Sequence, residues 1–262
     1  MATRRAPSAE PAATPATTRL RLLVAYDGRP FRGWQSQATK DAVQDFIEGA
    51  FARIVGRRVV VIGSGRTDAG VHALGQVAHA TVPGGLMPTA KWREALNANL
   101  PHEIRILKVA RARADFHAQF DAQGKEYLYR IWNGPFLHPL EIGRAWFVPR
   151  PLDLARLRDC ARLLEGTHDF ASFAANRGEP VADTERTIRR IRIARRGGLL
   201  TLRFEGDGFL YRMVRLLTGT LVRCAEGRAE PSFLTELLAA KGVKKTHFQA
   251  PAEGLYLARV LY

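Results

Sequence analysis

Residues 63–70 read Gly-Ser-Gly-Arg-Thr-Asp-Ala-Gly, a glycine-rich turn in which Arg66 and Asp68 stand two positions apart. Three glycines close together allow positive φ angles and let a bulky ligand approach the backbone. The flanking residues have the pattern of regular structure, so the turn offers a fixed carboxylate at a surface. In an isolated turn of this composition, Asp68 more often caps its own backbone while Arg66 is solvated. The octet by itself therefore leaves a structural turn and a ligand site both open.

Further motifs lie on both sides of this turn, which itself continues into Val71-His72 and Gly75-Gln76-Val77. They are Tyr26-Asp27-Gly28, Phe31-Arg32-Gly33-Trp34-Gln35-Ser36-Gln37, Asp115-Phe116-His117-Ala118, Lys125-Glu126-Tyr127-Leu128-Tyr129-Arg130, Phe209-Leu210-Tyr211-Arg212-Met213-Val214-Arg215 and Ala250-Pro251-Ala252-Glu253-Gly254-Leu255-Tyr256-Leu257. Together with the turn, these segments resemble the TruA family of tRNA pseudouridine synthases. They run in the family's order from residue 19 to the last residue of the chain, so only the first eighteen residues fall outside the resemblance.

Composition favours a protein that meets a polyanion. The chain has 40 Lys and Arg against 25 Asp and Glu, a formal net charge of +15 over 262 residues. Such an excess is typical of nucleic-acid binding, although a merely solvated basic surface gives the same count. No apolar run reaches the roughly 18 residues of a membrane span, and no signal core follows the first residues. We therefore expect a cytoplasmic protein.

The chain's two cysteines, Cys160 and Cys224, lack the paired spacing of a metal site or of a disulfide framework. Both lie on apolar faces of predicted helices, so we expect them to pack in the core and we predict no structural metal.

The pattern of apolar residues predicts alternating strands and helices. Residues 1–18 contain almost nothing large and apolar and are predicted to be a disordered tail. We expect an N-terminal α+β half over 19–124, which carries the catalytic aspartate, and a C-terminal α+β half over 125–262. Strands are predicted over 19–27, 76–82, 104–109, 126–132, 188–194 and 199–204. Helices are predicted from a cap at Asp41 to Gly56, and over 89–99, 152–164 and 211–225.

The two halves repeat a similar order of elements, which suggests a duplicated unit. The family resemblance implies an α+β fold of two pseudo-symmetric, ferredoxin-like halves. Their mostly antiparallel sheets would join into one extended sheet, with helices packed on one side and an active cleft between the halves.

The resemblance implies that the chain converts uridine to pseudouridine in tRNA. The N-glycosidic bond at C1′ breaks, the uracil turns while held, and C5 bonds to C1′, without any redox change. We therefore expect no cofactor, and the sequence shows no nucleotide-cofactor or metal fingerprint. Asp68 is the predicted catalytic residue. It can attack C1′ covalently, or stabilise positive charge there and remove a ribose proton, and the sequence leaves both routes open.

Three further residues are predicted to serve this carboxylate and the substrate. Arg215 resembles the family's partner of the catalytic aspartate and would keep Asp68 ionised, although Arg212 and Arg215 could instead lie on the wet stripe of a helix. Tyr127 and Tyr129 share one face of a strand, and either ring could stack on uracil. By position in the motif, Tyr127 matches the family's active-site tyrosine. Arg66 matches the arginine that fills the stack vacated by an extruded base.

Other residues receive weaker predictions. Asp115, Phe116 and His117 are expected to line the same approach. Three features depart from the family pattern: Gln119 replaces a usual arginine, Leu216 replaces a common asparagine, and Lys244-Lys245-Thr246-His247-Phe248 replaces a more usual Gly-Pro-Thr approach to the C-terminal motif. They leave the substrate preference less certain than the activity.

By resemblance, the targets are uridines at tRNA positions 38, 39 and 40 in the anticodon stem-loop, and the partners are tRNA and a second copy in a homodimer. The alternative is a non-catalytic RNA-binding module of the same fold. An RNA methyltransferase would instead show a glycine-rich cofactor loop followed by a separate acidic residue, which this turn does not resemble.

Overall fold

The structure is a computed structural model that describes residues 17–176, 178 and 182–262. It is an α+β fold built on one 10-stranded sheet. The strands are β1 (Thr17–Tyr26), β2 (Val61–Gly63), β3 (His72–Pro83), β4 (Ile104–Arg111), β5 (Gly124–Trp132), β6 (Trp146–Phe147), β7 (Gly166–Asp169), β8 (Glu185–Arg196), β9 (Leu199–Gly206) and β10 (Leu255–Leu261). The α-helices are α1 (Val43–Val55), α2 (Thr89–Asn97), α3 (Leu154–Arg162), α4 (Met213–Ala225) and α5 (Ser232–Ala239). Short 3-10 turns cover Pro139–Glu141, Ala171–Phe173 and Ala252–Gly254.

The two halves of the sheet have the same strand order, which confirms the predicted duplicated architecture. In the N-terminal half the neighbours are β4, β1, β3 and β2, and in the C-terminal half they are β10, β5, β9 and β8. Numbered within each half, both orders read fourth, first, third, second. This is the ferredoxin-like arrangement of two crossed β-α-β units. In the C-terminal half, β7 extends the sheet beyond β8, and β6 pairs with β5.

The two halves meet where β10 lies between β3 and β5. The pairing of β10 with β5 is antiparallel and long, whereas β10 and β3 are parallel and pair only through Tyr256 with His72 and Leu257 with Ala73. Further along β3, the same edge of the strand pairs with β2. The joint between the halves is therefore one short parallel pairing.

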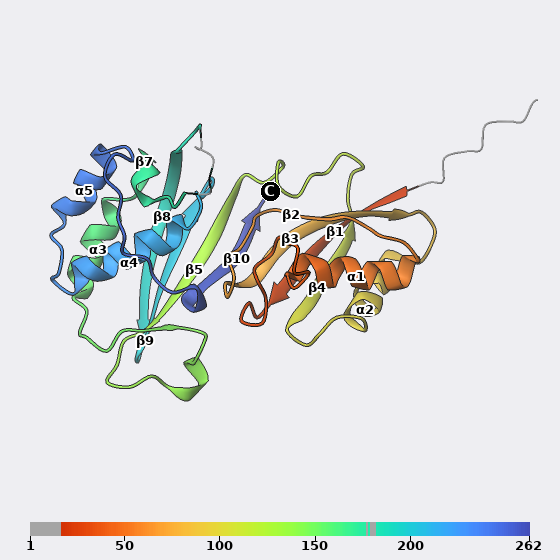
Figure 1. The fold of residues 1–262 in the computed structure, drawn as a ribbon, viewed down its shortest axis with the longest axis horizontal. Coiled ribbons are helices and arrows are strands. Elements are labelled where there is room, and N and C mark those ends of the chain that lie inside the picture. Colours follow the sequence, from red (N-terminus) through yellow and green to blue (C-terminus); the bar gives the residue numbers. More distant parts are fainter. Residues whose placement is uncertain (1–16, 177, 179–181) are drawn as a thin grey trace, which may run out of the picture.

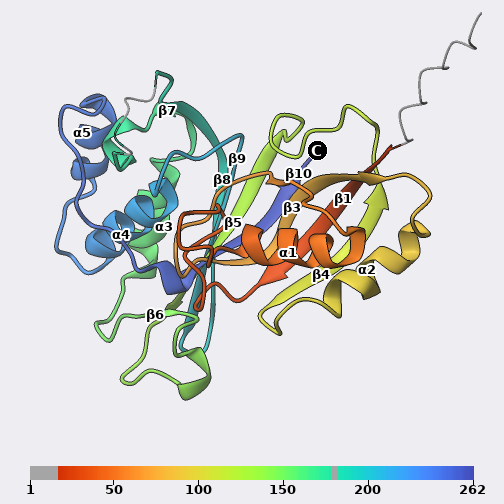
Figure 2. The same ribbon diagram turned by 45° about the vertical axis from the view of Figure 1, so that its right-hand side comes forward.

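The helices pack against one face of the sheet (Figure 1), and the view in Figure 2 shows α1 and α2 over the N-terminal strands and α3 and α4 beside the C-terminal ones. The helical periodicity of buried residues explains this packing: Val43, Ile47, Ala50 and Phe51 of α1 are all fully buried. Cys160 and Cys224 are buried and free, as predicted. Within the described residues, no helix is both long and apolar enough to cross a membrane.

Two predictions about local structure were wrong. The first strand begins at Thr17 rather than Arg19, because the β-branched Thr17 and Thr18 extend the ladder opposite Pro83 and Val82, so the predicted tail of residues 1–18 overlaps it. The rest of that tail lies outside the described residues.

Asp41 does not cap α1. The cap residue is Ala42, whose backbone N–H donates to the side chain of Asp45 in the first turn, while Asp41 accepts from Thr39 and pairs with Arg32. The helix does end at Gly56, which has a left-handed φ of 76°.

Candidate active site

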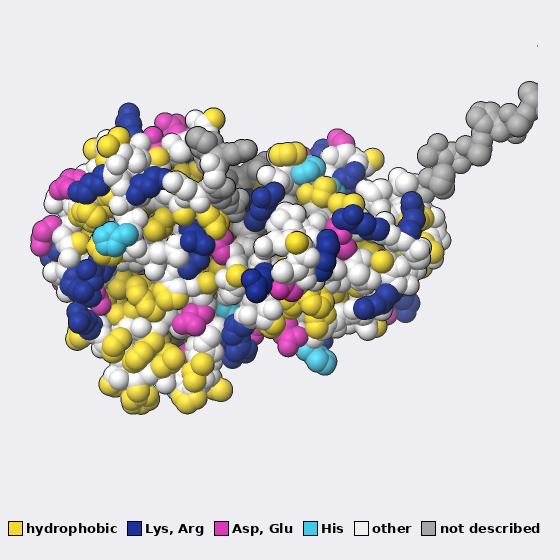
Figure 3. All heavy atoms as spheres, viewed as in Figure 1, with side chains coloured by type: hydrophobic (Ala, Val, Ile, Leu, Met, Phe, Trp, Pro, Cys, Tyr) yellow, Lys and Arg dark blue, Asp and Glu magenta, His cyan; other side chains and the backbone are white. Residues whose placement is uncertain are grey.

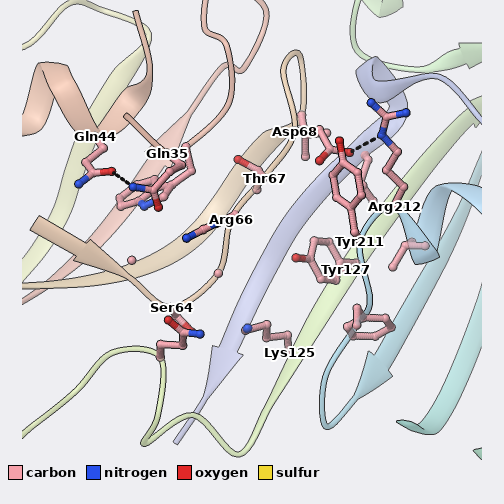
Figure 4. Close-up of a pocket in the computed structure, with 18 of the residues that line it drawn as sticks. Gln35, Gln44, Ser64, Arg66, Thr67, Asp68, Lys125, Tyr127, Tyr211 and Arg212 are labelled. Atoms are coloured by element: carbon pink, nitrogen blue, oxygen red, sulfur yellow. Dashed lines mark hydrogen bonds and ion pairs between the residues drawn. The ribbon is translucent and has the colours of Figure 1, made fainter. Parts of the chain in front are cut away.

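A cavity of about 530 Å³ lies between the two halves, next to the joint. Its N-terminal wall contains Trp34, Gln35, Gln44 and residues 60–68, and its C-terminal wall contains Lys125, Tyr127 and residues 209–214. Asp68, Arg66 and Tyr127 all line it, and Figure 4 shows them facing the same space. The fold therefore brings together three predicted site residues that come from distant parts of the sequence.

The loop that carries Asp68 is held against the loop after β1. The Trp34 backbone N–H donates to the Thr67 carbonyl at 3.1 Å, and the hydroxyls of Tyr26 and Thr67 lie 2.8 Å apart in a buried hydrogen bond. At the far end of the loop, the Gly70 N–H donates to the Phe31 carbonyl. These bonds fix the backbone on both sides of Asp68, so the carboxylate is held in one place before any ligand arrives.

Gly33 allows the two loops to approach this closely. Its φ is +88°, and a Cβ added there would lie 2.4 Å from the Thr67 carbonyl oxygen. We expect Gly33→Ala to lower the free energy of unfolding by about 2–4 kcal/mol, through left-handed strain and the clash together. We expect the uridine isomerisation that the resemblance implies to fall with it, because Thr67 adjoins Asp68. Equilibrium denaturation measures the first effect, and tritium release from uracil C5 of tRNA measures the second.

Gly85→Ala is the matched control for this prediction. Gly85 also has a left-handed φ, of +74°, but a Cβ there meets nothing within 4 Å. It therefore reports the backbone strain alone, about 1–2 kcal/mol. Equal losses of stability in the two variants, with activity intact in both, would show that the contact between Gly33 and Thr67 does not position the loop.

The Asp68 carboxylate is paired with a buried arginine. Arg215, in the first turn of α4, donates from Nη1 to Asp68 Oδ2 at 3.2 Å and from Nε to the Ala250 carbonyl at 2.8 Å. The Arg215 side chain is 11% exposed and that of Asp68 is 17% exposed, so the pair is largely removed from water. A charge-assisted hydrogen bond in such a place fixes the direction of the carboxylate.

Arg212 is a second cation beside Asp68, and sequence reasoning assigned it no separate role. Its Nε lies 3.9 Å from Asp68 Oδ2, its side chain is 39% exposed, and its guanidinium packs over the Tyr211 ring (Figure 4). Arg212 precedes α4 with a left-handed φ of 59°. The structure thus separates the two arginines: Arg215 is buried against Asp68, while Arg212 lies at the rim of the cavity.

Both tyrosines of β5 are buried, but only Tyr127 lines the cavity. Tyr129 is fully buried and donates its hydroxyl to the Pro251 carbonyl at 2.6 Å, so its ring is part of the core. Tyr127 lines the cavity with its ring edge-on to Phe209 at 5.1 Å. Burial, with added repulsion from Tyr26 and Asp68, raises the Tyr127 pKa above its ordinary value. Its hydroxyl therefore stays protonated at neutral pH.

Of the remaining residues that were predicted to contact the substrate, some line the cavity and others do not. Arg66 is exposed and lines the cavity. Asp115, Phe116 and His117 do not line it: Phe116 packs against Tyr262, and His117 Nδ1 accepts backbone N–H groups of its own turn. Gln119, one of the departures from the family pattern, does line it.

Leu216, a second departure from the family pattern, is buried in the core. Among the described residues, no group of three or more His, Cys, Asp or Glu residues is arranged to hold a metal ion.

His72 fastens the start of β3 to the C-terminal half. Its Nδ1 accepts the Gly28 N–H at 3.1 Å, and its Nε2 therefore carries the proton and donates to the Gly143 carbonyl at 3.1 Å. The ring stacks on Tyr256 of β10 at 4.5 Å. Burial lowers the His72 pKa, against the opposing effect of Asp27. A neutral histidine thus links the Asp68 loop to both sides of the joint.

Comparison with known proteins shows the family of the chain. The family model described as tRNA pseudouridine synthase matches residues 22–121 and 160–262, which include the Asp68 loop and α4. The chain belongs to the tRNA pseudouridine synthase family. It is therefore an isomerase that acts on uridine in tRNA.

Individual relatives match this family member over nearly its whole length. The tRNA pseudouridine synthase A of Akkermansia muciniphila is 44% identical over 252 residues, covering 94% of this chain and 95% of the relative. The enzymes of the same name from Geobacillus kaustophilus and Bacillus licheniformis are 42% and 41% identical, and cover 94% and 93% of this chain and 95% and 99% of their own. Among solved structures, a Cbf5-Nop10-Gar1 complex matches 78% of this chain and 44% of its own at 12% identity and a TM-score of 0.36.

Proposed function

We propose that this family member isomerises uridines 38, 39 and 40 in the anticodon stem-loop of tRNA, with Asp68 as the catalytic group. The observation that carries the proposal is that Asp68 lines a cavity shared by both halves and is paired at 3.2 Å with the buried Arg215 behind it. The family resemblance of the motifs supplies the tRNA positions and a homodimer, and the sequence, which lacks an apolar run of membrane-spanning length, supplies the cytoplasmic location.

Asp68 acts at the ribose. As an ionised carboxylate it either bonds to C1′ as N1 of uracil leaves, or stabilises positive charge at C1′ while it takes a ribose proton. In both routes the N1–C1′ bond breaks, the C5–C1′ bond forms, and the hydrogen on C5 leaves as a proton. Arg215 holds the carboxylate in place at the cavity through its hydrogen bond to Asp68, and its second hydrogen bond, to the Ala250 carbonyl, fixes the guanidinium itself.

The uracil needs a surface that holds it while it turns. Tyr127 offers a ring face in the cavity, and base–aromatic stacking is worth about 1–3 kcal/mol per base. Because its hydroxyl is protonated, Tyr127 can donate a hydrogen bond to the displaced base but does not act as a base at neutral pH.

The target nucleotide must first leave its stack, which costs a few kcal/mol. Arg66 is exposed at the edge of the cavity and, among the described residues, engages no carboxylate, so its guanidinium is available to take the vacated place in the RNA. Figure 3 shows Lys and Arg side chains over both halves of the face that it presents, which suits a large polyanion.

The proposal is tested with tRNA transcripts that carry tritium at uracil C5. We expect the wild-type chain to release tritium from unmodified transcripts, and to lose that release when positions 38, 39 and 40 are all cytidine. A transcript with uridine restored at one of these positions should recover it.

The same assay separates the alternative function. Binding of tRNA without tritium release from any transcript would leave an RNA-binding module of this fold. Release that persists in the transcript lacking uridines 38, 39 and 40 would keep the isomerase and overturn the proposed positions.

A further inference from the structure

Lys125 is a cation of the cavity that the reaction described above does not use. It is the second residue of β5 and lines the cavity with two other cations, Arg66 and Arg212. The described lining residues include one carboxylate, Asp68, which is already paired with Arg215 and Arg212. Within the described part of the chain, Lys125 makes no hydrogen bond or ion pair. The cavity therefore has positive charge that the protein itself does not neutralise.

The position of this ammonium is built into the catalytic loop. A Cβ at Gly65 would lie 3.1 Å from Lys125 Nζ and 3.4 Å from its Cε, so Gly65 leaves the space in which the end of the lysine lies. The side chain is partly buried, and burial lowers the Lys125 pKa below its ordinary value. An ammonium placed out of water with no partner costs stability, which favours a role toward a ligand.

The geometry also shows which part of an RNA the ammonium can reach. Lys125 and Tyr127 point to the same face of β5, about 7 Å apart along the strand. In Figure 4, Tyr127 lies between Asp68 and Lys125, and the ammonium is directed into the cavity away from the Asp68–Arg212 end. If the ribose of the target uridine lies at Asp68 and its base lies against Tyr127, the adjacent stretch of RNA backbone lies next to Lys125.

We propose that Lys125 binds a phosphate of the RNA strand that carries the target uridine, adjacent to the extruded nucleotide. This assignment rests on the proposed function of the cavity. A compact ammonium on a flexible stem suits a phosphate oxygen as a point charge. Lys125 is thus a substrate-binding residue that fixes the strand beside the extruded uridine, while Asp68 and Arg215 act at the ribose.

The test compares Lys125→Met with Lys125→Arg and with Lys108→Met. Lys108 is exposed on β4, does not line the cavity, and undergoes the same loss of charge. Binding of unmodified tRNA is measured over a series of salt concentrations, and tritium release is measured at saturating tRNA. For Lys125→Met we expect affinity at low salt to fall about three- to tenfold, and the slope of log affinity against log salt to decrease by about 0.7. The turnover number should stay within about threefold of the wild type.

The other variants show whether this effect belongs to Lys125. Lys125→Arg should keep the wild-type slope, and Lys108→Met should leave affinity and slope unchanged. The thermal midpoint of Lys125→Met should be equal to or above that of the wild type, because an unpaired charge is removed.

Three results would overturn the assignment: an unchanged salt slope, a slope reduced equally in Lys108→Met, or a large drop in thermal midpoint. A turnover number that falls strongly with the slope unchanged would mean that Lys125 acts on the departing uracil and not on a phosphate. Absence of tritium release by the wild type would instead contradict the proposed function, so the two failures are distinguishable.

Discussion

Asp68→Asn should reduce tritium release from tRNA by at least about 10³-fold, the scale expected when an essential nucleophile or base is removed. The amide has nearly the same shape as the carboxylate and can still accept the Arg215 hydrogen bond, which is now 3.2 Å long. It cannot bond covalently to C1′ as a carboxylate does, nor take a ribose proton at neutral pH. The affinity for tRNA should therefore remain within about threefold of the wild type while chemistry is lost.

The matched control for this change is Asp115→Asn. Asp115 lies outside the cavity with its side chain 78% exposed, so the same chemical change there should leave activity and affinity unaltered. Circular dichroism and the thermal midpoint would confirm that both variants fold. Substantial tritium release by a folded Asp68→Asn variant would show that another group carries the reaction.

Arg215→Met should lower activity by about 10²-fold, the cost of a misplaced catalytic group. It removes both the partner of Asp68 and the donor to the Ala250 carbonyl, and it leaves the carboxylate with only the more distant and more exposed Arg212. Arg215→Lys should be intermediate, because an ammonium keeps the charge but not the two fixed directions of the guanidinium. Single-turnover tritium release at saturating tRNA measures the effect on chemistry apart from binding.

Arg223→Met is the control on the same helix. Arg223 lies eight residues further along α4, where its guanidinium packs over the Phe248 ring and does not reach the cavity. It should cost some stability but little activity. Arg212→Met is expected to lose no more than about tenfold, since an exposed pair contributes little. If Arg212→Met proved more damaging than Arg215→Met, the roles given to the two arginines would be reversed.

Much of the secondary structure follows from local signals in the sequence. The amphipathic period of residues 43–55 and the left-handed glycine after it mark α1 almost to the residue. The short strands β2, β6 and β7 were not predicted, because two to four residues are too few to show a period. α5 was missed as well. The strand order within each half came from the family resemblance, since apolar periodicity says nothing about which strands are neighbours.

The residues of the candidate site were likewise predictable from sequence motifs, whereas their arrangement in space was not. Asp68, Tyr127, Arg66 and Arg215 were chosen through motifs, and their sequence positions alone do not show that β5 and α4 meet the loop of residue 68. Arg212 and Arg215 lie within one helical turn of each other, so their spacing in the sequence does not show which of them is buried. Tertiary packing places Arg215 in the interior and Arg212 at the rim of the cavity. For Lys125, the only sequence signal of a role in the site was its place in the motif that also contains Tyr127. The space that Gly65 leaves for its ammonium is visible only in the structure.

The short parallel pairing between β10 and β3 bears on how this molecule assembles. His72 and Tyr256, which form one of its two residue pairs, are 184 positions apart in the chain. Contacts between such distant residues close a long loop and form late, after local elements have folded. During synthesis, the N-terminal half emerges with its Asp68 loop long before the strand that joins it to Tyr127 and Arg215. The nascent chain therefore carries the Asp68 carboxylate without a cavity, and the candidate site is completed only when β10 enters the sheet.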